Sequence, residues 1–419
     1  MFPIKPTDKR LVYLDHAATT PVHKEVLDAM LPYFTEHFGN PSALYHIGRE
    51  VKNAVDQARK MIAGYLGTQA DSIIFCSGGT ESDNMAIFGV AKKHAHKGKH
   101  IITSEVEHHA VLHACEQLEK EGFEVTYLRP DETGLVSATQ VKEALRPDTI
   151  LVSIMYANNE IGTVEPIADI GREILKWRKA EGTVYPYFHT DACQAAGVLD
   201  LNVEKLHVDL LTMNGSKLYG PKGIGVLYKR RGFAIQPLIV GGAQEFRMRA
   251  GTEHMPGIIG FAKAFDLAQK KRVEENTRLI ELRAYFWKEL QKRISKIRLN
   301  GPELDGVDVR LPNNLNISIL DIEGEALLLY LDEYGIVCST GSACTSESLD
   351  PSHVLLACGL PYEYAHGSIR FTLGASTSKE DIDYVLTYLP AIVEKLREIS
   401  PVRLSQNPTD NTHPTYLQR

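Results

Sequence analysis

The chain has 419 residues, of which 43% are hydrophobic and 24% are charged, and its formal net charge is −7. The length predicts two domains in an ordinary globular protein. The negative charge argues against a nucleic-acid-binding protein, and no apolar run approaches the roughly 20 residues that span a bilayer.

The six cysteines include no C-x-x-C pair, so the sequence predicts neither a disulfide framework nor a zinc site. The N-terminus has no apolar segment of the kind found in secretory signals. A reducing cytoplasm is therefore the expected location.

Strands alternate with helices along the first half of the chain. The expected strands are 11–14, 72–76, 100–104, 124–128, 149–155, 187–190 and 208–213. The expected helices are 23–34, 49–66, 81–94, 110–121, 141–145 and 167–180. This alternation predicts an α/β fold with a mostly parallel sheet flanked by helices.

The pattern changes after Gly260. A long charged helix is expected over 261–297, as a link between two domains. Smaller elements follow, with strands at 313–320 and 368–373 and helices at 326–334 and 379–398. We therefore predict a large domain over 16–260, a smaller α/β domain formed by 1–15 and 261–400, and a polar tail over 401–419.

Polar clusters follow five of the predicted strands. They are 77–80, 105–109, 158–160, 191–194 and 214–217. Because ligands of parallel sheets bind at the carboxyl ends of the strands, these clusters predict one shared site.

Lys217 lies in a glycine- and proline-rich loop between two apolar runs. A lysine in a desolvated pocket can lose its proton and act as an amine nucleophile. We interpret Lys217 as the residue that forms a Schiff base with pyridoxal phosphate (PLP). Taken alone, the loop fits a surface lysine in a β-turn better, so the interpretation depends on the other clusters.

The run that follows the 72–76 strand suits an anion. Backbone N–H groups at a helix N-terminus attract negative charge, so a phosphate is expected on Gly79 and Thr80. The alternative is an ordinary turn in which Thr80 caps the helix and Asp83 completes a capping box.

A histidine and an aspartate follow two other strands. His108 could stack on a planar cofactor and move protons, although a capping histidine is commoner and the adjacent His109 competes for the role. Asp191 could pair with the PLP pyridine nitrogen, and Gln194 with the ring hydroxyl, unless Asp191 only caps a turn.

The stretch 337–346 is small, polar and contains glycine. A thiol there, Cys344, is expected to be exposed and more reactive than Cys76 or Cys358, which lie among apolar residues. Arg370 lies in an apolar strand, where its charge calls for a bidentate carboxylate partner.

Ten motifs carry a family resemblance from about residue 11 to residue 400. They are YLDHAATTP, FGNPS, SGGTESDN, EVEHHAVL, NNEIG, HTDACQ, KLYGPKGIG, RAGTEH, GSACTS and SIRFTLG. Together they resemble the cysteine desulfurases, within the class V aminotransferase group of fold type I PLP enzymes. GSACTS resembles the NifS/IscS-like branch.

The resemblance implies a PLP-dependent homodimer and a role for each matching residue. Lys217 holds PLP, His108 stacks on it, Asp191 pairs with its nitrogen, and Gln194 and Asn159 contact the ring oxygen or substrate. The phosphate is bound by Gly79, Thr80, Asn214, Gly215 and Ser216, and by Thr252 of the other subunit. Arg370 holds the substrate carboxylate and Cys344 accepts the sulfur. No resident metal is implied, apart from transient ligation of a shared iron–sulfur cluster by Cys344.

The implied reaction converts L-cysteine to L-alanine and leaves a persulfide on Cys344. The sulfur then passes to an iron–sulfur scaffold, a tRNA-thiolation protein or another acceptor. An aminotransferase or selenocysteine lyase could use the same lysine, and a sulfur-relay subunit could have lost catalysis. Two features depart from the family pattern: Ser216 replaces the usual histidine before the lysine, and Cys338 is either core filler or a second thiol.

Overall fold

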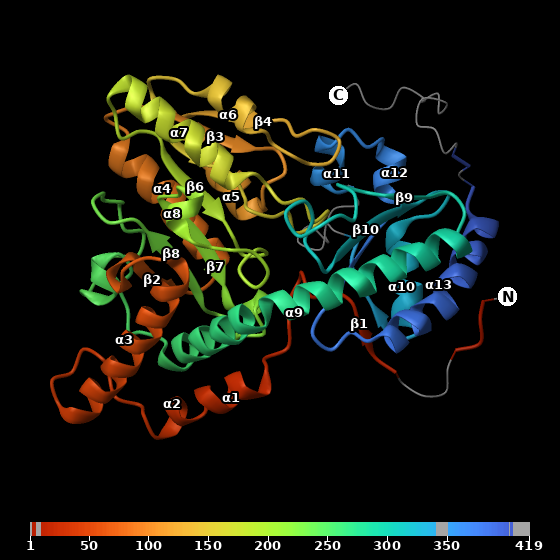
Figure 1. Ribbon diagram of the computed structural model, residues 1–419, viewed down its shortest axis with the longest axis horizontal. Helices are drawn as coiled ribbons and strands as arrows, with labels where there is room; N and C mark the ends of the chain where they lie inside the picture. Colours follow the sequence, from red (N-terminus) through yellow and green to blue (C-terminus); the bar gives the residue numbers. More distant parts are fainter. Residues whose placement is uncertain (1, 6–9, 341–350, 402, 405–419) are drawn as a thin grey trace.

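The computed structural model describes residues 2–5, 10–340, 351–401, 403 and 404 (Figure 1). Its largest sheet has seven strands in the order β2-β8-β7-β6-β5-β3-β4. These strands are β2 (Ile73–Cys76), β3 (His100–Ser104), β4 (Glu124–Leu128), β5 (Thr149–Ser153), β6 (Tyr187–Asp191), β7 (Leu210–Asn214) and β8 (Gly225–Lys229). Only β8 runs against its neighbours, which confirms the mostly parallel sheet.

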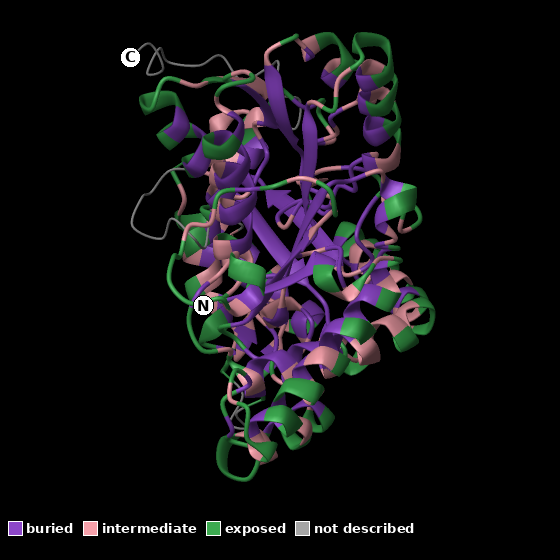
Figure 2. Cartoon of the chain, turned by 90° about the vertical axis from the view of Figure 1, so that its left-hand side faces the viewer, coloured by how far each residue is buried: buried purple, intermediate pink, exposed green. Residues whose placement is uncertain are grey.

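Helices cover both faces of this sheet, so its strands are buried on both sides, except for the edge strand β4, which is mostly half-buried (Figure 2). In β2, Ile74 and Cys76 face one hydrophobic cluster while Ile73 and Phe75 face another, as the two-residue period of a strand requires. The first cluster lies under α4 (Gly79–His94) and α5 (His109–Lys120). The second lies under α3 (His46–Leu66), α6 (Ala138–Ala144), α7 (Ile167–Glu181) and the start of α9 (Met255–Arg293).

A second lobe surrounds a three-stranded antiparallel sheet in the order β12-β10-β9. Its strands are β9 (Ile297–Leu299), β10 (Asn314–Ile319) and β12 (Ser368–Thr372). The end of α9, α10 (Gly324–Asp332) and α13 (Lys379–Ile399) pack on it. β1 (Val12–Tyr13) pairs in parallel with β11 (Ile336–Val337), and α11 (His353–Ala357) and α12 (Tyr362–His366) contribute to a smaller cluster.

The 39-residue helix α9 runs between the lobes (Figure 1). The helix expected over 261–297 was therefore placed too late: α9 begins at Met255, where Pro256 suits the first turn, and ends at Arg293. Residue 297 instead begins β9, because it pairs with β10. None of the described helices is long and apolar enough to cross a membrane.

The helix expected over 23–34 is also divided. It forms α1 (Lys24–Met30) and α2 (Pro32–Thr35), because Pro32 has no N–H to continue the hydrogen-bond ladder. The remaining short elements are α8 (Val203–Leu206) and the 3₁₀ turns Ala70–Ser72, Gly215–Lys217 and Gln244–Arg247.

Candidate active site

Side chains from all five strand-end clusters line one cavity of about 400 Å³ at the carboxyl edge of the large sheet. An arginine from β12 of the second lobe also lines it. The predicted residues that line this cavity are Gly79, Thr80, His108, Asn159, Asp191, Gln194, Asn214, Lys217 and Arg370.

Three of the described predicted residues, Gly215, Ser216 and Thr252, do not line the cavity. Gly215 is buried, and a Cβ added to it would lie 2.6 Å from the Pro221 carbonyl oxygen. The backbone carbonyl of Ser216 accepts a hydrogen bond from the Thr20 N–H, and Thr252 is exposed on the surface. Cys344 lies outside the described residues.

The N-terminus of α4 forms one end of the cavity. Its cap residue is Gly78, which provides no side-chain hydrogen bond, and Thr80 lies within the helix. The alternative in which Thr80 caps the helix and Asp83 completes a capping box is therefore wrong. The Ser77 N–H instead donates a hydrogen bond to the Glu81 carboxylate. The first N–H groups of a helix have no partner within it, so this end can bind an anion.

Glycine is required at position 79 because the backbone comes close to other groups. A Cβ at Gly79 would lie 2.8 Å from the Cys193 Sγ atom and 3.3 Å from the Asn214 Nδ2 atom. The Oδ1 atom of Asn214 is buried without a hydrogen-bond partner in the described part of the chain. A polar atom left in this state indicates a ligand or water at the same place.

His108 both caps α5 and lines the cavity. Its Nδ1 accepts a hydrogen bond from the Ala110 N–H at 3.1 Å, so the neutral ring carries its proton on Nε2. Burial lowers the pKa of His108, although the nearby Asp191 carboxylate opposes this effect. His109 does not line the cavity and instead lies against His113 and His353.

Asp191 ends β6 and is 7% exposed, with its Oδ1 accepting the Cys193 N–H at 2.8 Å. A second carboxyl group, Asp83 on α4, also lines the cavity. Burial raises the pKa of Asp83 well above its usual value, and the Asp191 charge adds to that effect. Sequence reasoning missed Asp83 because its position near a helix start was attributed to capping.

Lys217 ends the 3₁₀ turn that follows β7. Its Nζ donates a hydrogen bond to the Ala18 carbonyl, and Gln194 Nε2 donates to the Ala17 carbonyl at 3.0 Å. The N-terminal segment 15–20 therefore forms a wall of the cavity. Sequence analysis missed this wall because no local pattern links these residues to a loop about 200 positions away.

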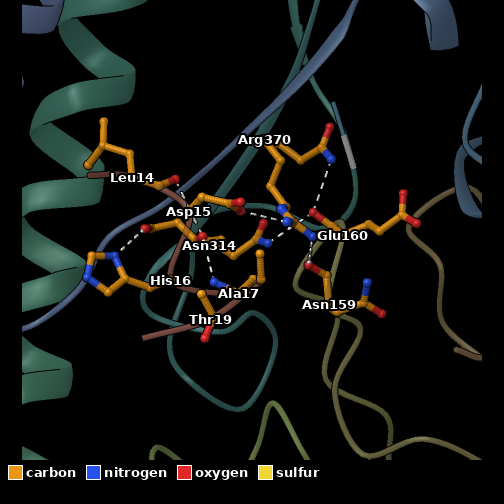
Figure 3. Close-up of polar contacts among 12 residues, drawn as sticks. Leu14, Asp15, His16, Ala17, Thr19, Asn159, Glu160, Asn314 and Arg370 are labelled. Carbon is orange, nitrogen blue, oxygen red and sulfur yellow. Dashed lines mark hydrogen bonds and ion pairs between the residues drawn. The ribbon is translucent and has the colours of Figure 1, made fainter. Parts of the chain in front are cut away.

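The guanidinium group of Arg370 already has hydrogen-bond partners within the chain (Figure 3). Its Nη1 donates to the Asn159 carbonyl and its Nη2 to Asp15 Oδ1, both at 2.8 Å. Asp15, another residue that sequence reasoning missed, is thus a carboxylate partner of the kind expected for Arg370, although it contacts one guanidinium nitrogen. The Nε atom is buried and has no hydrogen-bond partner among the described residues.

The described cysteines, at 76, 115, 193, 338 and 358, are all buried. Cys338 is 5% exposed within the core of the second lobe, and burial raises its pKa. This placement favours core filler over a second reactive thiol.

The residues of the cavity fit PLP. A helix N-terminus and Gly79 can receive a phosphate, Asp191 can face a protonated pyridine nitrogen, and Lys217 can bind the aldehyde carbon. The unpartnered Asn214 Oδ1 atom supports a polar ligand beside this helix end.

Comparisons with known proteins agree with this chemistry. The family described as aminotransferase class-V matches residues 12–385. Cysteine desulfurase IscS of Dictyoglomus turgidum is 56% identical over 395 residues, which cover 94% of this chain and 98% of that protein.

Two solved structures are similar in fold. A NifS-like protein superposes with a TM-score of 0.85 and 35% identity, covering 92% of this chain and all of the other. A structure described as SspA in complex with cysteine superposes with a TM-score of 0.74 and 38% identity, covering 86% and 98% of the two chains.

Proposed function

The chain belongs to the class-V aminotransferase family, in its NifS/IscS-like branch, and is a cysteine desulfurase; from this premise we propose that Lys217 binds PLP and that Cys344 accepts the sulfur of L-cysteine. The observation that carries the proposal is the meeting of Lys217, Asp191 and the α4 N-terminus in one cavity.

The cofactor would be held at three places. Gly79 and Thr80 bind the phosphate, and Asp191 holds the pyridine nitrogen. Asn214 lies beside Gly79 and completes the phosphate site together with Gly215 and Ser216, which follow it in the sequence. His108 covers the ring, and Gln194 and Asn159 contact its oxygen or the substrate. When bound, PLP supplies an electron sink for the carbanion left when an amino acid loses its Cα proton.

The chain's own residues perform the proton and sulfur steps. Arg370 and Asn159 orient the substrate through its carboxylate, and Lys217 or His108 removes the Cα proton. The Cys344 thiolate attacks the substrate sulfur, so an S–S bond forms while the substrate C–S bond breaks. The carbon that loses sulfur is protonated, and L-alanine leaves.

The proposed role of Cys344 is supported by described residues on both sides of it in the sequence. The Ser339 N–H donates to the Arg370 carbonyl at 3.1 Å, and the Arg370 N–H donates back. Beyond Cys344, the Ser352 hydroxyl donates to the buried Glu160 carboxylate, one residue from Asn159. Both flanking segments are therefore attached to residues beside the cavity.

The first test exchanges lysines. Lys217→Arg keeps the charge but cannot form a Schiff base, so we expect loss of the PLP absorption band and of alanine production. Lys222→Arg is the matched control, because Lys222 lies in the same loop and its Nζ donates to the Thr20 carbonyl. Normal turnover in Lys217→Arg would show that the proposal is wrong.

The second test exchanges cysteines. Cys344→Ala should keep the PLP absorption band and lose sulfide release from cysteine, while the buried Cys338→Ala control keeps both. Alanine production by Cys344→Ala without sulfide would indicate another sulfur acceptor, and normal sulfide release would remove Cys344 from the mechanism.

We further propose that the enzyme is a cytoplasmic homodimer in which Thr252 reaches the phosphate in the other subunit. The exposed position of Thr252 supports this role. The persulfide would pass to an iron–sulfur scaffold or a tRNA-thiolation protein, and a pull-down with persulfide-loaded enzyme would identify the acceptor.

A further inference from the structure

Arg370 already has an anionic neighbour before any substrate carboxylate arrives (Figure 3). Its Nη2 atom contacts Asp15 Oδ1 at 2.8 Å, and the two side chains are 3% and 14% exposed. The buried Nε atom has no hydrogen-bond partner among the described residues. Arg370 can therefore bind a second carboxylate, but that carboxylate would lie beside the first.

The backbone holds Asp15 next to Arg370. Thr372, two residues after Arg370 on β12, donates its N–H to the Leu14 carbonyl at 2.7 Å. The His16 N–H donates back to the Thr372 carbonyl at 3.3 Å, and the Ala17 N–H donates to its Oγ1 at 2.9 Å. The residues on both sides of Asp15 are fixed to the arginine-bearing strand, so the carboxylate stays at the site.

Two like charges at a poorly hydrated site repel each other more strongly than they would in water. Asp15 therefore has two opposite effects: it orients the guanidinium group, and it weakens the attraction of Arg370 for an incoming carboxylate. A substitution that keeps a hydrogen-bond acceptor and removes the charge separates these effects. Asparagine at this position meets that condition, because its side-chain oxygen can still accept from Nη2.

We propose that Asp15 is a counter-charge that weakens the carboxylate anchor at Arg370 and thereby favours release of the product L-alanine. The inference rests on the proposed function, in which Arg370 holds the carboxylate. Substrate and product share this carboxylate, so tight binding of it would lower KM without accelerating the chemistry and would retain the product. Asp15 is thus a positioning residue with an electrostatic role.

The test measures inhibition by two ligands in the PLP-loaded enzyme. Asp15→Asn should bind L-alanine about three- to tenfold more tightly than the wild type, with a parallel decrease in KM for L-cysteine. Ethylamine, which lacks the carboxylate, should inhibit both enzymes equally. A purely structural role for Asp15 predicts weaker binding of L-alanine in the variant.

Two further variants make the result specific. Asp381→Asn removes a carboxylate that is paired with Arg10 outside the cavity, at 2.6 Å, and should leave inhibition by L-alanine unchanged. Asp15→Ser removes the same charge with a smaller hydroxyl group and should shift inhibition in the same direction as Asp15→Asn. Unchanged or weaker L-alanine binding in both Asp15 variants, or equal tightening for ethylamine, would overturn the inference.

Arg370→Gln separates failure of the inference from failure of the proposed function. Weaker L-alanine binding in Arg370→Gln supports the anchor, and unchanged binding removes Arg370 from the proposed function. If Arg370→Gln weakens binding while the Asp15 variants do not strengthen it, the anchor remains and only the counter-charge role is wrong.

Discussion

Glu107, the residue before His108, is completely buried and is not among the residues that line the cavity. Its Oε1 accepts hydrogen bonds from the Ser104 hydroxyl and the Met155 N–H, both at 2.8 Å. Burial nevertheless raises its pKa to about 8. Because an unfolded glutamate titrates near 4.3, the folded state retains a proton between about pH 4.3 and pH 8 that the unfolded state has lost.

This difference gives a pH-dependent stability. Over that window the folded state binds more protons than the unfolded state, so Glu107 makes the protein less stable as pH rises. Glu107→Gln cannot ionise, and its stability relative to the wild type should increase by on the order of 3 kcal/mol from pH 5 to pH 8. Thermal unfolding at pH 5, 6.5 and 8 measures this change.

The exposed Glu116 provides the control, since Glu116→Gln makes the same change of charge on the surface. Its stability relative to the wild type should not vary with pH in this way. If the difference in stability between Glu107→Gln and the wild type is the same at all three pH values, the assignment of a buried proton to Glu107 is wrong.

At the scale of elements, the loop after β7 depends on Thr20. The Thr20 side chain donates to the Ser216 carbonyl at 3.0 Å and accepts the Tyr219 N–H at 2.8 Å. Its own N–H also donates to the Ser216 carbonyl, at 2.9 Å. These bonds flank Lys217 on both sides, so Thr20 fixes the segment from which the lysine side chain extends.

Thr20→Val keeps the shape of the side chain and removes its hydroxyl group, which leaves the Tyr219 N–H without its partner. We expect a loss of stability of about 1–3 kcal/mol and a lower retention of PLP after dialysis. Thr20→Ser keeps the hydroxyl and should resemble the wild type in both measurements. Equal PLP retention in the valine and serine variants would show that the hydroxyl does not position the loop.

Local patterns identified the elements of the sheet well, because their signals are short-range. The strands 100–104 and 124–128 were predicted with the bounds that the structure has. The start of α9 was missed because Gly260 suggested a break. Gly260 is instead a point of close packing, where a Cβ would lie 2.5 Å from the Met30 Sδ atom. Only tertiary structure shows such a contact.

At the scale of the molecule, apolar side chains are exposed along the segment that contains α1 to α3. Leu31 is 52% exposed, Phe34 56%, Phe38 64% and Leu44 88%. Exposed apolar surface of this kind is typical of an interface between proteins. We assign it to the proposed homodimer.

Leu31→Glu combined with Phe34→Glu should convert the homodimer to a monomer of 46.6 kDa, as measured by light scattering after size-exclusion chromatography. Leu329→Glu is the control, because Leu329 is 69% exposed on α10 of the other lobe and should leave the dimer intact. A dimeric double variant would place the interface elsewhere.

The sequence predicted those residues of the site that lie at the ends of predicted strands. Lys217, Asp191 and His108 follow strands of one sheet, so the rule for parallel sheets brings them together. Asp15 meets Arg370 across 355 positions, and no periodic pattern carries information over that separation. The division into domains near residue 260 remains a prediction, since α9 contributes side chains to the hydrophobic clusters of both lobes.

The wall formed by residues 15–20 has a consequence for synthesis on the ribosome. This segment pairs with Thr372 on β12, and β1 just before it pairs with β11, where Ile336 lies opposite Val12. At usual translation speeds, roughly 20 to 70 s separate the emergence of the two regions. During that time β1 is an unpaired strand and the lysine pocket lacks one side. The cavity is therefore complete only after Arg370, which also lines it, has been synthesised.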